Sequence, residues 1–158
     1  MSADNEFWRF SLRVYAASDV ADECLALQDK FGIDVNLLLF CAWLAVERGI
    51  TLSADDLRDC DRATSEWHDR AVRTLRAARR AMKGLAGAED MRAQVKMLEL
   101  TAERLEQEWL YSFAMQRWPE RGSAAPREAL GRNLDLFLRA HSAPGAESVA
   151  ALLAAAGC

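Results

Sequence analysis

The residues most suited to chemistry include a short acidic motif, Asp-Asp-Leu-Arg-Asp at positions 55–59. It matches the D-D-x-x-D pattern with which isoprenoid synthases hold magnesium and a diphosphate, and carboxylates one helical turn apart can share a hard cation. Those enzymes require a second acidic motif, which this sequence lacks. Acidic side chains also stabilise a helix N-terminus through the helix dipole. We therefore interpret residues 55–59 as the start of a helix and not as a diphosphate site.

A cluster of basic residues follows the acidic motif. Residues 70–83 contain six basic residues and no acid, so they could bind an anionic ligand or partner. A solvated helix face whose charges complement the helix dipole explains most of them. Arg79 differs, because at 100° per residue it falls at the edge of the apolar face and needs an internal partner. Arg76 is a second arginine of this group.

The step Asp34-Val35-Asn36 directly precedes ten consecutive apolar residues, 37–46. An aspartate in this position can cap a helix by accepting backbone N–H groups two and three residues later. Asn36 then lies in the first turn, near the positive end of the helix dipole. The apolar run predicts a buried central helix with Trp43 as its largest side chain. We interpret Asp34 as a cap, and a ligand site there is the alternative.

Metal-binding and nucleophilic sites are not expected. The chain has two histidines, no Glu-x-x-His and no Cys-x-x-Cys, and we see no Ser-His-Asp set and no glycine-rich phosphate loop. Glu99, Glu103 and Glu106 share one helix face, which we expect to be a wet surface with Arg104. The sequence thus predicts no metal ligands, no catalytic residues and no cofactor.

The elements that position these groups are helices throughout. Alanine, leucine, arginine and glutamate are abundant, and no segment shows the alternation of a strand. We predict an all-α, single-domain bundle of about six or seven helices. Two long helices with apolar residues at 4-3 spacing form an antiparallel hairpin in its middle, and the last helix is weakly anchored. The expected segments are apolar N-terminal helices in 4–49, the hairpin in 53–118, a linker at 119–125 and C-terminal helices in 126–158.

Composition excludes several classes of function. The net charge is −4 and the pI about 5.3, so nothing favours nucleic acid or an anionic membrane. The ten-residue apolar run is too short for a membrane span, and the N-terminus does not resemble a signal peptide. We expect a cytoplasmic protein in which Cys24 and Cys41 are reduced and buried.

Three segments carry a resemblance to a known family. They are "FWRFSLRVYA" (7–16), "CLALQDKFGIDVNLLLFCAWLA" (24–45) and "LRAARRAMK" (75–83). With them the chain resembles a conserved family of small proteobacterial proteins, a domain of unknown function. The resemblance implies a soluble helical bacterial protein and supplies no activity, cofactor or catalytic residue. The polar positions of the family pattern map onto Gln28, Asp29, Asp34, Asn36, Arg76 and Arg79.

Two functions from different classes remain open. The first is a non-enzymatic protein–protein interaction module, which would bind another protein or a second copy through apolar helical surface. The second is a small-molecule or anion-binding protein, and this class includes enzymes. Its site would hold Asp29, Asp34 and Asn36 facing Arg76 and Arg79. A buried pocket around these groups favours the second function, and an exposed apolar patch favours the first.

Overall fold

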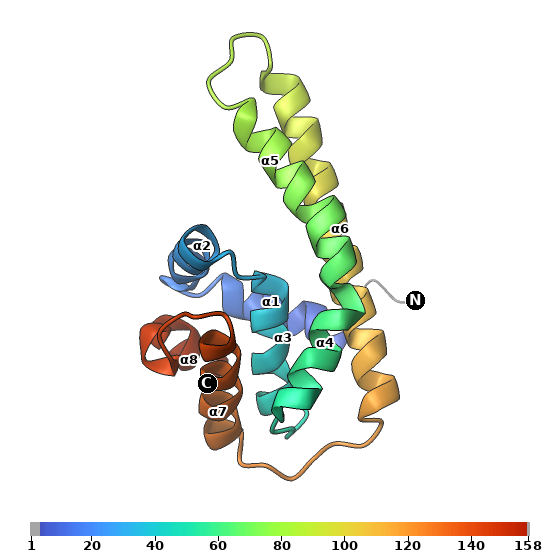
Figure 1. The fold of residues 1–158 in the computed structure, drawn as a ribbon, viewed down its shortest axis with the longest axis vertical. Helices are drawn as coiled ribbons and strands as arrows, with labels where there is room; N and C mark the ends of the chain where they lie inside the picture. Colours follow the sequence, from blue (N-terminus) through green and yellow to red (C-terminus); the bar gives the residue numbers. More distant parts are fainter. Residues whose placement is uncertain (1–3, 158) are drawn as a thin grey trace.

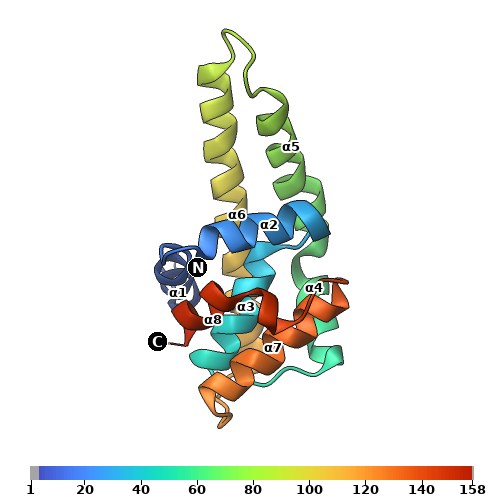
Figure 2. The same cartoon turned by 90° about the vertical axis from the view of Figure 1, so that its left-hand side faces the viewer.

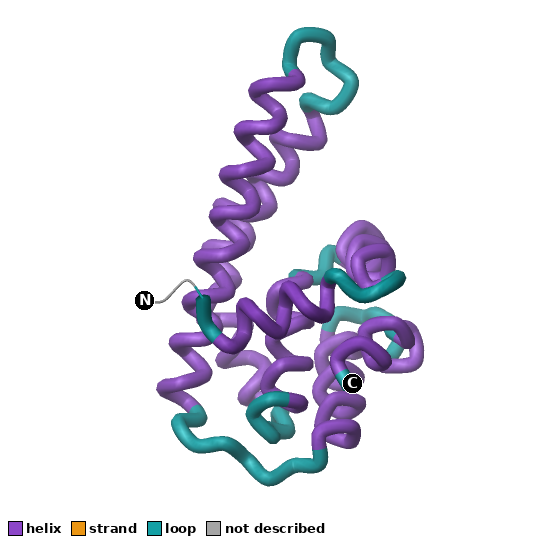
Figure 3. The backbone as a smooth tube through the Cα atoms, turned by 180° about the vertical axis from the view of Figure 1, so that it is seen from behind, coloured by secondary structure: helices purple, strands orange, loops and turns teal. Residues whose placement is uncertain are grey.

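The structure is a computed structural model that describes residues 4–157, and within this range it contains helices and no strand (Figure 3). The prediction of an all-α protein is therefore confirmed. The helices are α1 (Glu6–Tyr15), α2 (Val20–Phe31), α3 (Val35–Val46), α4 (Ala54–Trp67), a π-helical segment (His68–Val72), α5 (Arg73–Ala81), α6 (Glu89–Arg117), α7 (Pro126–Ala140), a 3₁₀ turn (Ala146–Ser148) and α8 (Ala150–Ala156).

Helix α3 forms the centre of the body, with α1, α6, α7 and α8 packed around it (Figures 1 and 2). Every residue from Asn36 to Ala45 is buried, as the unbroken apolar run predicts. Trp43 is fully buried, and the rings of Phe7 and Phe40 lie with centroids 5.4 and 5.7 Å from its own. A helix that is apolar on all sides can be stable in water only when its neighbours cover it completely.

Helices α4 and α5 form one continuous rod through the π-helical segment, and this rod pairs with α6 as a hairpin that projects beyond the body (Figure 1). The expectation that apolar residues at 4-3 spacing pack the two hairpin helices together is wrong for the outer half of the hairpin. Met91 and Leu98 are 63% and 57% exposed, whereas Glu99 is buried. The reason is that α5 presents arginines to α6, and a carboxylate rather than leucine meets them. Counted with α4 and α5 as one rod, the number of α-helices agrees with the predicted number.

The C-terminal helix was expected to be weakly anchored, and the structure corrects this. Val149 and Leu152 are fully buried. The carboxylate of Glu23 on α2 accepts the backbone N–H groups of Ala151 at 2.8 Å and Leu152 at 3.0 Å. A carboxylate at a helix N-terminus both satisfies free N–H groups and interacts favourably with the dipole. Helix α8 is thus held on the body although its sequence is mostly alanine.

Segment 119–125, the expected linker, is held against the turn after α3. The backbone N–H groups of Gly122 and Ala124 donate to the carbonyls of Arg48 and Gly49, at 2.7 and 3.1 Å. Gly49 has a φ of +66°, and a β-carbon there would collide with the carbonyl of Gly122. The buried guanidinium of Arg48 also donates to the carbonyl of Trp118 at 2.9 Å.

None of the helices in the described range is long and apolar enough to cross a membrane.

The thiols of Cys24, Cys41 and Cys60 are all fully buried, which gives a testable prediction. Burial raises the pKa of each thiol, and for Cys24 and Cys60 to about 12. Because the thiolate is the reactive form, we expect these cysteines to react with an aromatic disulfide reagent only as fast as the protein unfolds. Cys158 lies outside the described residues. Peptide mapping after timed labelling measures each rate, and rapid labelling of Cys60 in the native protein would contradict the assignment.

Candidate functional site

A cleft of about 290 Å³ opens where the hairpin meets the body, and we call it the central cleft. Residues from α1, α2, the start of α3, the π-helical segment, α5 and α6 line it. Its apolar wall consists of Trp8, Leu12, Tyr15, Leu25, Val35, Leu39 and Leu100. Its polar residues are Ser11, Gln28, Asp34, Asn36, His68, Arg76, Arg79, Glu99, Glu103 and Gln107. Small-ligand sites are typically concave and combine apolar walls with convergent polar groups, as this cleft does.

The Asp34 carboxylate contacts two parts of the structure, the first turn of α3 and His68. Its Oδ1 accepts the backbone N–H groups of Asn36 at 2.9 Å and Leu37 at 3.2 Å, so the predicted N-cap is confirmed. Its other oxygen, Oδ2, lies 3.2 Å from Nδ1 of His68. The cap therefore fixes one carboxylate oxygen and directs the second toward the histidine.

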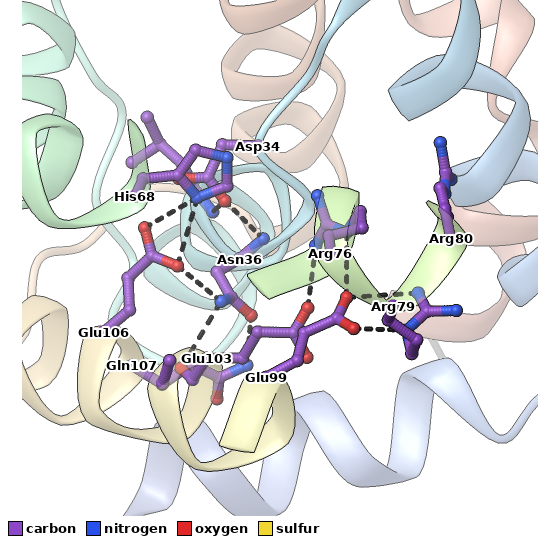
Figure 4. A network of polar contacts seen from close by, with 12 residues as sticks. Asp34, Asn36, His68, Arg76, Arg79, Arg80, Glu99, Glu103, Glu106 and Gln107 are labelled. Carbon is purple, nitrogen blue, oxygen red and sulfur yellow. Dashed lines mark hydrogen bonds and ion pairs between the residues drawn. The ribbon is translucent and has the colours of Figure 1, made fainter. Parts of the chain in front are cut away.

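Glu106 approaches the same histidine from α6, and Asp34, His68 and Glu106 together form what we call the buried triad (Figure 4). Nδ1 of His68 lies 3.1 Å from Oε1 and 3.3 Å from Oε2 of Glu106, whose side chain is completely buried. Burial and the Glu106 carboxylate raise the pKa of Asp34. Burial favours neutral His68, but its hydrogen bond to the Glu106 carboxylate and the negative charges of Asp34 and Glu106 outweigh burial, so the pKa of His68 is raised.

Two amide side chains extend the polar contacts from the triad into the cleft. Nδ2 of Asn36 donates to Oε2 of Glu106 at 2.7 Å, and Nε2 of Gln107 donates to Oδ1 of Asn36 at 2.9 Å. A carboxylate can only accept hydrogen bonds when ionised, so it fixes which end of the Asn36 amide faces it, and Asn36 then fixes Gln107. Oε1 of Gln107 is therefore left without a partner at the end of this series of hydrogen bonds.

Two arginines of α5 bind two glutamates of α6 on the other side of the cleft (Figure 4). Arg76 donates to Oε1 of Glu99 at 3.0 Å and to Oε1 of Glu103 at 2.8 Å, and Arg79 also binds Glu99. Burial opposes the ionised form of Glu99, but these hydrogen bonds outweigh it and its pKa is lowered. Burial raises the pKa of Glu103. The expectation of a wet surface at Glu99, Glu103 and Glu106 is thus wrong, because paired arginines and a histidine allow Glu99 and Glu106 to be buried and Glu103 to be half-buried.

Four of the five candidate residues named from the sequence line the central cleft, namely Asp34, Asn36, Arg76 and Arg79. The fifth, Asp29, does not reach it. Its side chain is 58% exposed and accepts a hydrogen bond from Arg80 at 2.7 Å on the outer surface. The acidic motif at 55–59 also lies elsewhere. There the Asp56 side chain completes a capping box with Ser53, as the helix-start interpretation predicts.

Sequence reasoning missed half of the site. The candidates did not include His68, Glu99, Glu103, Glu106 or Gln107. The three glutamates among them recur on one face of a helix at spacings of 4 and 3. That spacing was a usable signal, because an acidic stripe facing a basic helix in a hairpin can be buried as ion pairs. The histidine gave a weaker signal as a polar residue on the apolar seam of its helix.

Two residues that line the central cleft, Ser11 and Gln107, each have a buried side-chain oxygen without a hydrogen-bond partner, Oγ and Oε1 respectively. The two residues are 4% and 5% exposed. Leaving such a group unsatisfied costs about 1–3 kcal/mol, so native proteins rarely tolerate it without a compensating interaction. Because both residues line the central cleft, a molecule bound there is one candidate partner for them.

The two partners of Asp34 can be separated by mutation. Asp34→Ser and Asp34→Ala both remove the carboxylate beside His68, but serine can still cap α3. We expect Asp34→Ala to be less stable than Asp34→Ser by about 0.5–2 kcal/mol in urea unfolding. The structure places Arg79 on Glu99, so a double-mutant cycle between Asp34→Ser and Arg79→Leu should show coupling below about 0.5 kcal/mol. Coupling above about 1.5 kcal/mol would mean that Asp34 and Arg79 pair directly.

Comparison with known proteins identifies the family of the chain. No curated protein and no solved structure was found to match it. The model of a family described as "Protein of unknown function (DUF2390)" matches residues 6–110, which is more than half of the chain. Every residue that lines the central cleft lies in this range, whereas α7 and α8 lie beyond it. The chain therefore belongs to the DUF2390 family of proteins of unknown function, as the resemblance of its helical segments predicted.

Proposed function

We propose that the protein binds a small molecule in the central cleft, with an apolar body against α1, α2 and α6 and a hydrogen-bond-donating head at the polar end. The observation that carries this proposal is that two residues lining one cleft, Ser11 and Gln107, each have a buried side-chain oxygen without a partner. A ligand that donates to Gln107 would satisfy an acceptor that the protein itself leaves unpaired.

The charges favour a neutral or cationic head over an anion. The polar end of the cleft and the triad beneath it bring four carboxylates together with two arginines and one histidine. Arg76 and Arg79 are already neutralised by Glu99 and Glu103. An added anion would find no unpaired positive charge among these groups, whereas an ammonium or hydroxyl group would find free acceptors.

The rim of the cleft supports an apolar body for the ligand. Leu12, Tyr15, Leu25 and Leu100 are between 37% and 53% exposed and lie on three different helices around the opening. Each square ångström of apolar surface that a ligand covers contributes about 25 cal/mol. Large exposed side chains gathered at a cleft are more informative than the same residues scattered singly over a surface.

The proposal can be tested with three linear molecules of equal chain length, n-octylamine, n-octanol and n-octanoate. Isothermal titration calorimetry on the full chain should give the strongest binding for the amine, weaker binding for the alcohol and the weakest for the carboxylate. Ser11→Ala should weaken amine binding about five- to tenfold, the value of one hydrogen bond. It should raise the free energy of unfolding by up to about 1–3 kcal/mol, because it removes a buried hydroxyl that makes no bond in the free protein.

Ser65→Ala on α4 is the matched control, since this serine does not line the cleft. It should bind the three molecules like the wild type. If octanoate bound as tightly as octylamine, or if Ser65→Ala lost as much affinity as Ser11→Ala, the proposed site and its preference for a donor would be wrong.

A second candidate function is association between copies of the chain through the projecting hairpin. Leu85, Met91, Met97 and Leu98 are between 57% and 63% exposed there, and none of them lines the central cleft. Sedimentation across a wide concentration range should show self-association that the double variant Met97→Glu, Leu98→Glu abolishes without loss of helicity. A wild-type chain that stays monomeric throughout would contradict this function.

A further inference from the structure

We infer that the buried triad of Asp34, His68 and Glu106 is a binding site for one divalent transition-metal ion, with Zn²⁺ as the reference ion. One potential ligand atom from each residue lies within 4.8 Å of the other two. The residues come from the N-cap of α3, the π-helical segment and α6, so tertiary packing alone brings them together. This inference concerns the ion alone and does not rest on the proposed small-molecule ligand.

The distances fit the edges of a coordination polyhedron. Nδ1 of His68 lies 3.2 Å from Oδ2 of Asp34 and 3.1 Å from Oε1 of Glu106. Nitrogen and oxygen ligands sit at about 2.0–2.2 Å from Zn²⁺, so two ligands at a tetrahedral or right angle are roughly 3.0–3.5 Å apart. An ion in place of the shared proton would therefore need only small side-chain movements.

Each carboxylate is already oriented as a metal ligand would be. Oδ1 of Asp34 is held by two backbone N–H groups, which leaves Oδ2 for the ion. Oε2 of Glu106 is held by the Asn36 amide at 2.7 Å, which leaves Oε1. Hydrogen bonds to the outer atoms of ligands fix their direction and are a regular feature of metal sites.

The charge of the triad also favours a divalent cation. Two carboxylates and a neutral imidazole carry a formal charge of −2, which one divalent ion cancels. The arginines closest to the cleft are engaged by Glu99 and Glu103. Buried charges are costly unless they are paired or coordinate a metal, and the side chains of Glu106 and His68 are only 0% and 9% exposed.

The local backbone and the opening of the site agree with this assignment. His68 begins a five-residue π-helical segment, and such turns inside α-helices occur often at functional sites. Asp34 and His68 both line the central cleft, so an ion bound between them would have an open side toward it. Three protein ligands with an open fourth position distinguish zinc sites that bind water or substrate from closed structural sites.

The test is calorimetric titration of the full chain, treated with chelator and dialysed, with ZnCl₂, MnCl₂ and MgCl₂. We expect one Zn²⁺ per chain, weaker Mn²⁺ and the weakest response for Mg²⁺, because imidazole suits transition metals. Binding should release a proton, since the Nδ1 position of His68 must be free of hydrogen, and two buffers of different ionisation enthalpy reveal this. Zn²⁺ should also raise the melting temperature.

Three variants each remove one ligand, His68→Gln, Glu106→Gln and Asp34→Ser, the last of which can still cap α3. Each should weaken Zn²⁺ binding by more than about tenfold, the least effect expected even for a supporting residue. Glu108→Gln and His141→Gln are the matched controls, since Glu108 lies on the same helix as Glu106 and neither residue belongs to the triad. They should bind Zn²⁺ like the wild type. Circular dichroism establishes which variants are folded, and any folded one of the three suffices.

Other results would overturn the inference. No Zn²⁺ binding by the wild type, or equal binding by a folded triad variant, would show that the triad holds only a proton. A thiolate-to-metal absorption band on adding Co²⁺ would place the ion at a cysteine instead. Failure of the small-molecule proposal is distinguishable, because Ser11→Ala should alter octylamine binding and leave Zn²⁺ binding unchanged.

Discussion

Replacing Trp43 by alanine is expected to lower the free energy of unfolding by about 3–5 kcal/mol, the usual cost of emptying a large buried aromatic site. The indole is fully buried in the centre of α3 and contacts the rings of Phe7, Phe40 and Tyr111 at centroid distances of 5.4, 5.7 and 5.7 Å. These rings belong to other turns and to α1 and α6, so the cavity would loosen three helices together. Urea unfolding monitored by circular dichroism measures the loss.

Trp43→Phe provides the matched control. The indole nitrogen of Trp43 has no hydrogen-bond partner, so phenylalanine loses no bond and keeps much of the apolar volume. We expect this variant to cost clearly less than alanine. A loss below about 1 kcal/mol for Trp43→Ala would mean that α3 is not the centre of the core.

Replacing Asn133 by leucine is expected to cost about 3–5 kcal/mol, although leucine is apolar and the site is completely buried. The Asn133 amide on α7 donates to the carbonyls of Cys41 at 3.1 Å and Ile50 at 2.9 Å. Its oxygen accepts the backbone N–H of Leu52 at 2.8 Å. Removing the amide leaves the peptide groups of the segment after α3 unsatisfied, and each costs about 1–3 kcal/mol.

Gln94→Leu is a suitable control for this variant, because Gln94 is an exposed amide on the outer part of α6. Its change in stability should stay within about 0.5 kcal/mol. Thermal and urea unfolding of both variants provide the comparison. Equal losses for the two would show that the Asn133 hydrogen bonds do not hold α7 to the segment after α3.

The local features of this protein could be derived from its sequence. Helix periodicity is repeated every few residues, so the sequence alone predicted the all-α class and the buried helix around Trp43. The caps at Asp34 and Ser53 follow equally from neighbours two and three positions away, and the structure has both. The family resemblance rested on the same segments, which the family model also covers.

The candidate site was only half accessible by this route. Asp34 and Asn36 are distinctive because they stand at the start of an unbroken apolar run, and Arg79 because it falls at the edge of an apolar helix face. Asp29 is an aspartate like Asp34 and was grouped with these residues, yet it lies on the outer surface, where it pairs with Arg80. Gly32, in the left-handed region at φ +64°, ends α2 between the two aspartates and redirects the chain. The helices before and after that turn therefore face different partners.

Tertiary structure alone decided the buried triad and the charge pairs of the hairpin. His68 and Glu106 are 38 positions apart, and Arg76 and Glu99 are 23 apart, so no local pattern links them. From its sequence, a glutamate on a helix is expected to be solvated. It is buried only where a neighbouring helix covers it and supplies a cation. The π-helical turn adds to this, because it turns the residues after His68 relative to those before it without a signal in the sequence. The sequence determined which segments are helical and which faces are apolar. The docking of α3, the rod and α6 determined which polar groups meet, because the burial of a charge depends on partners far away along the chain.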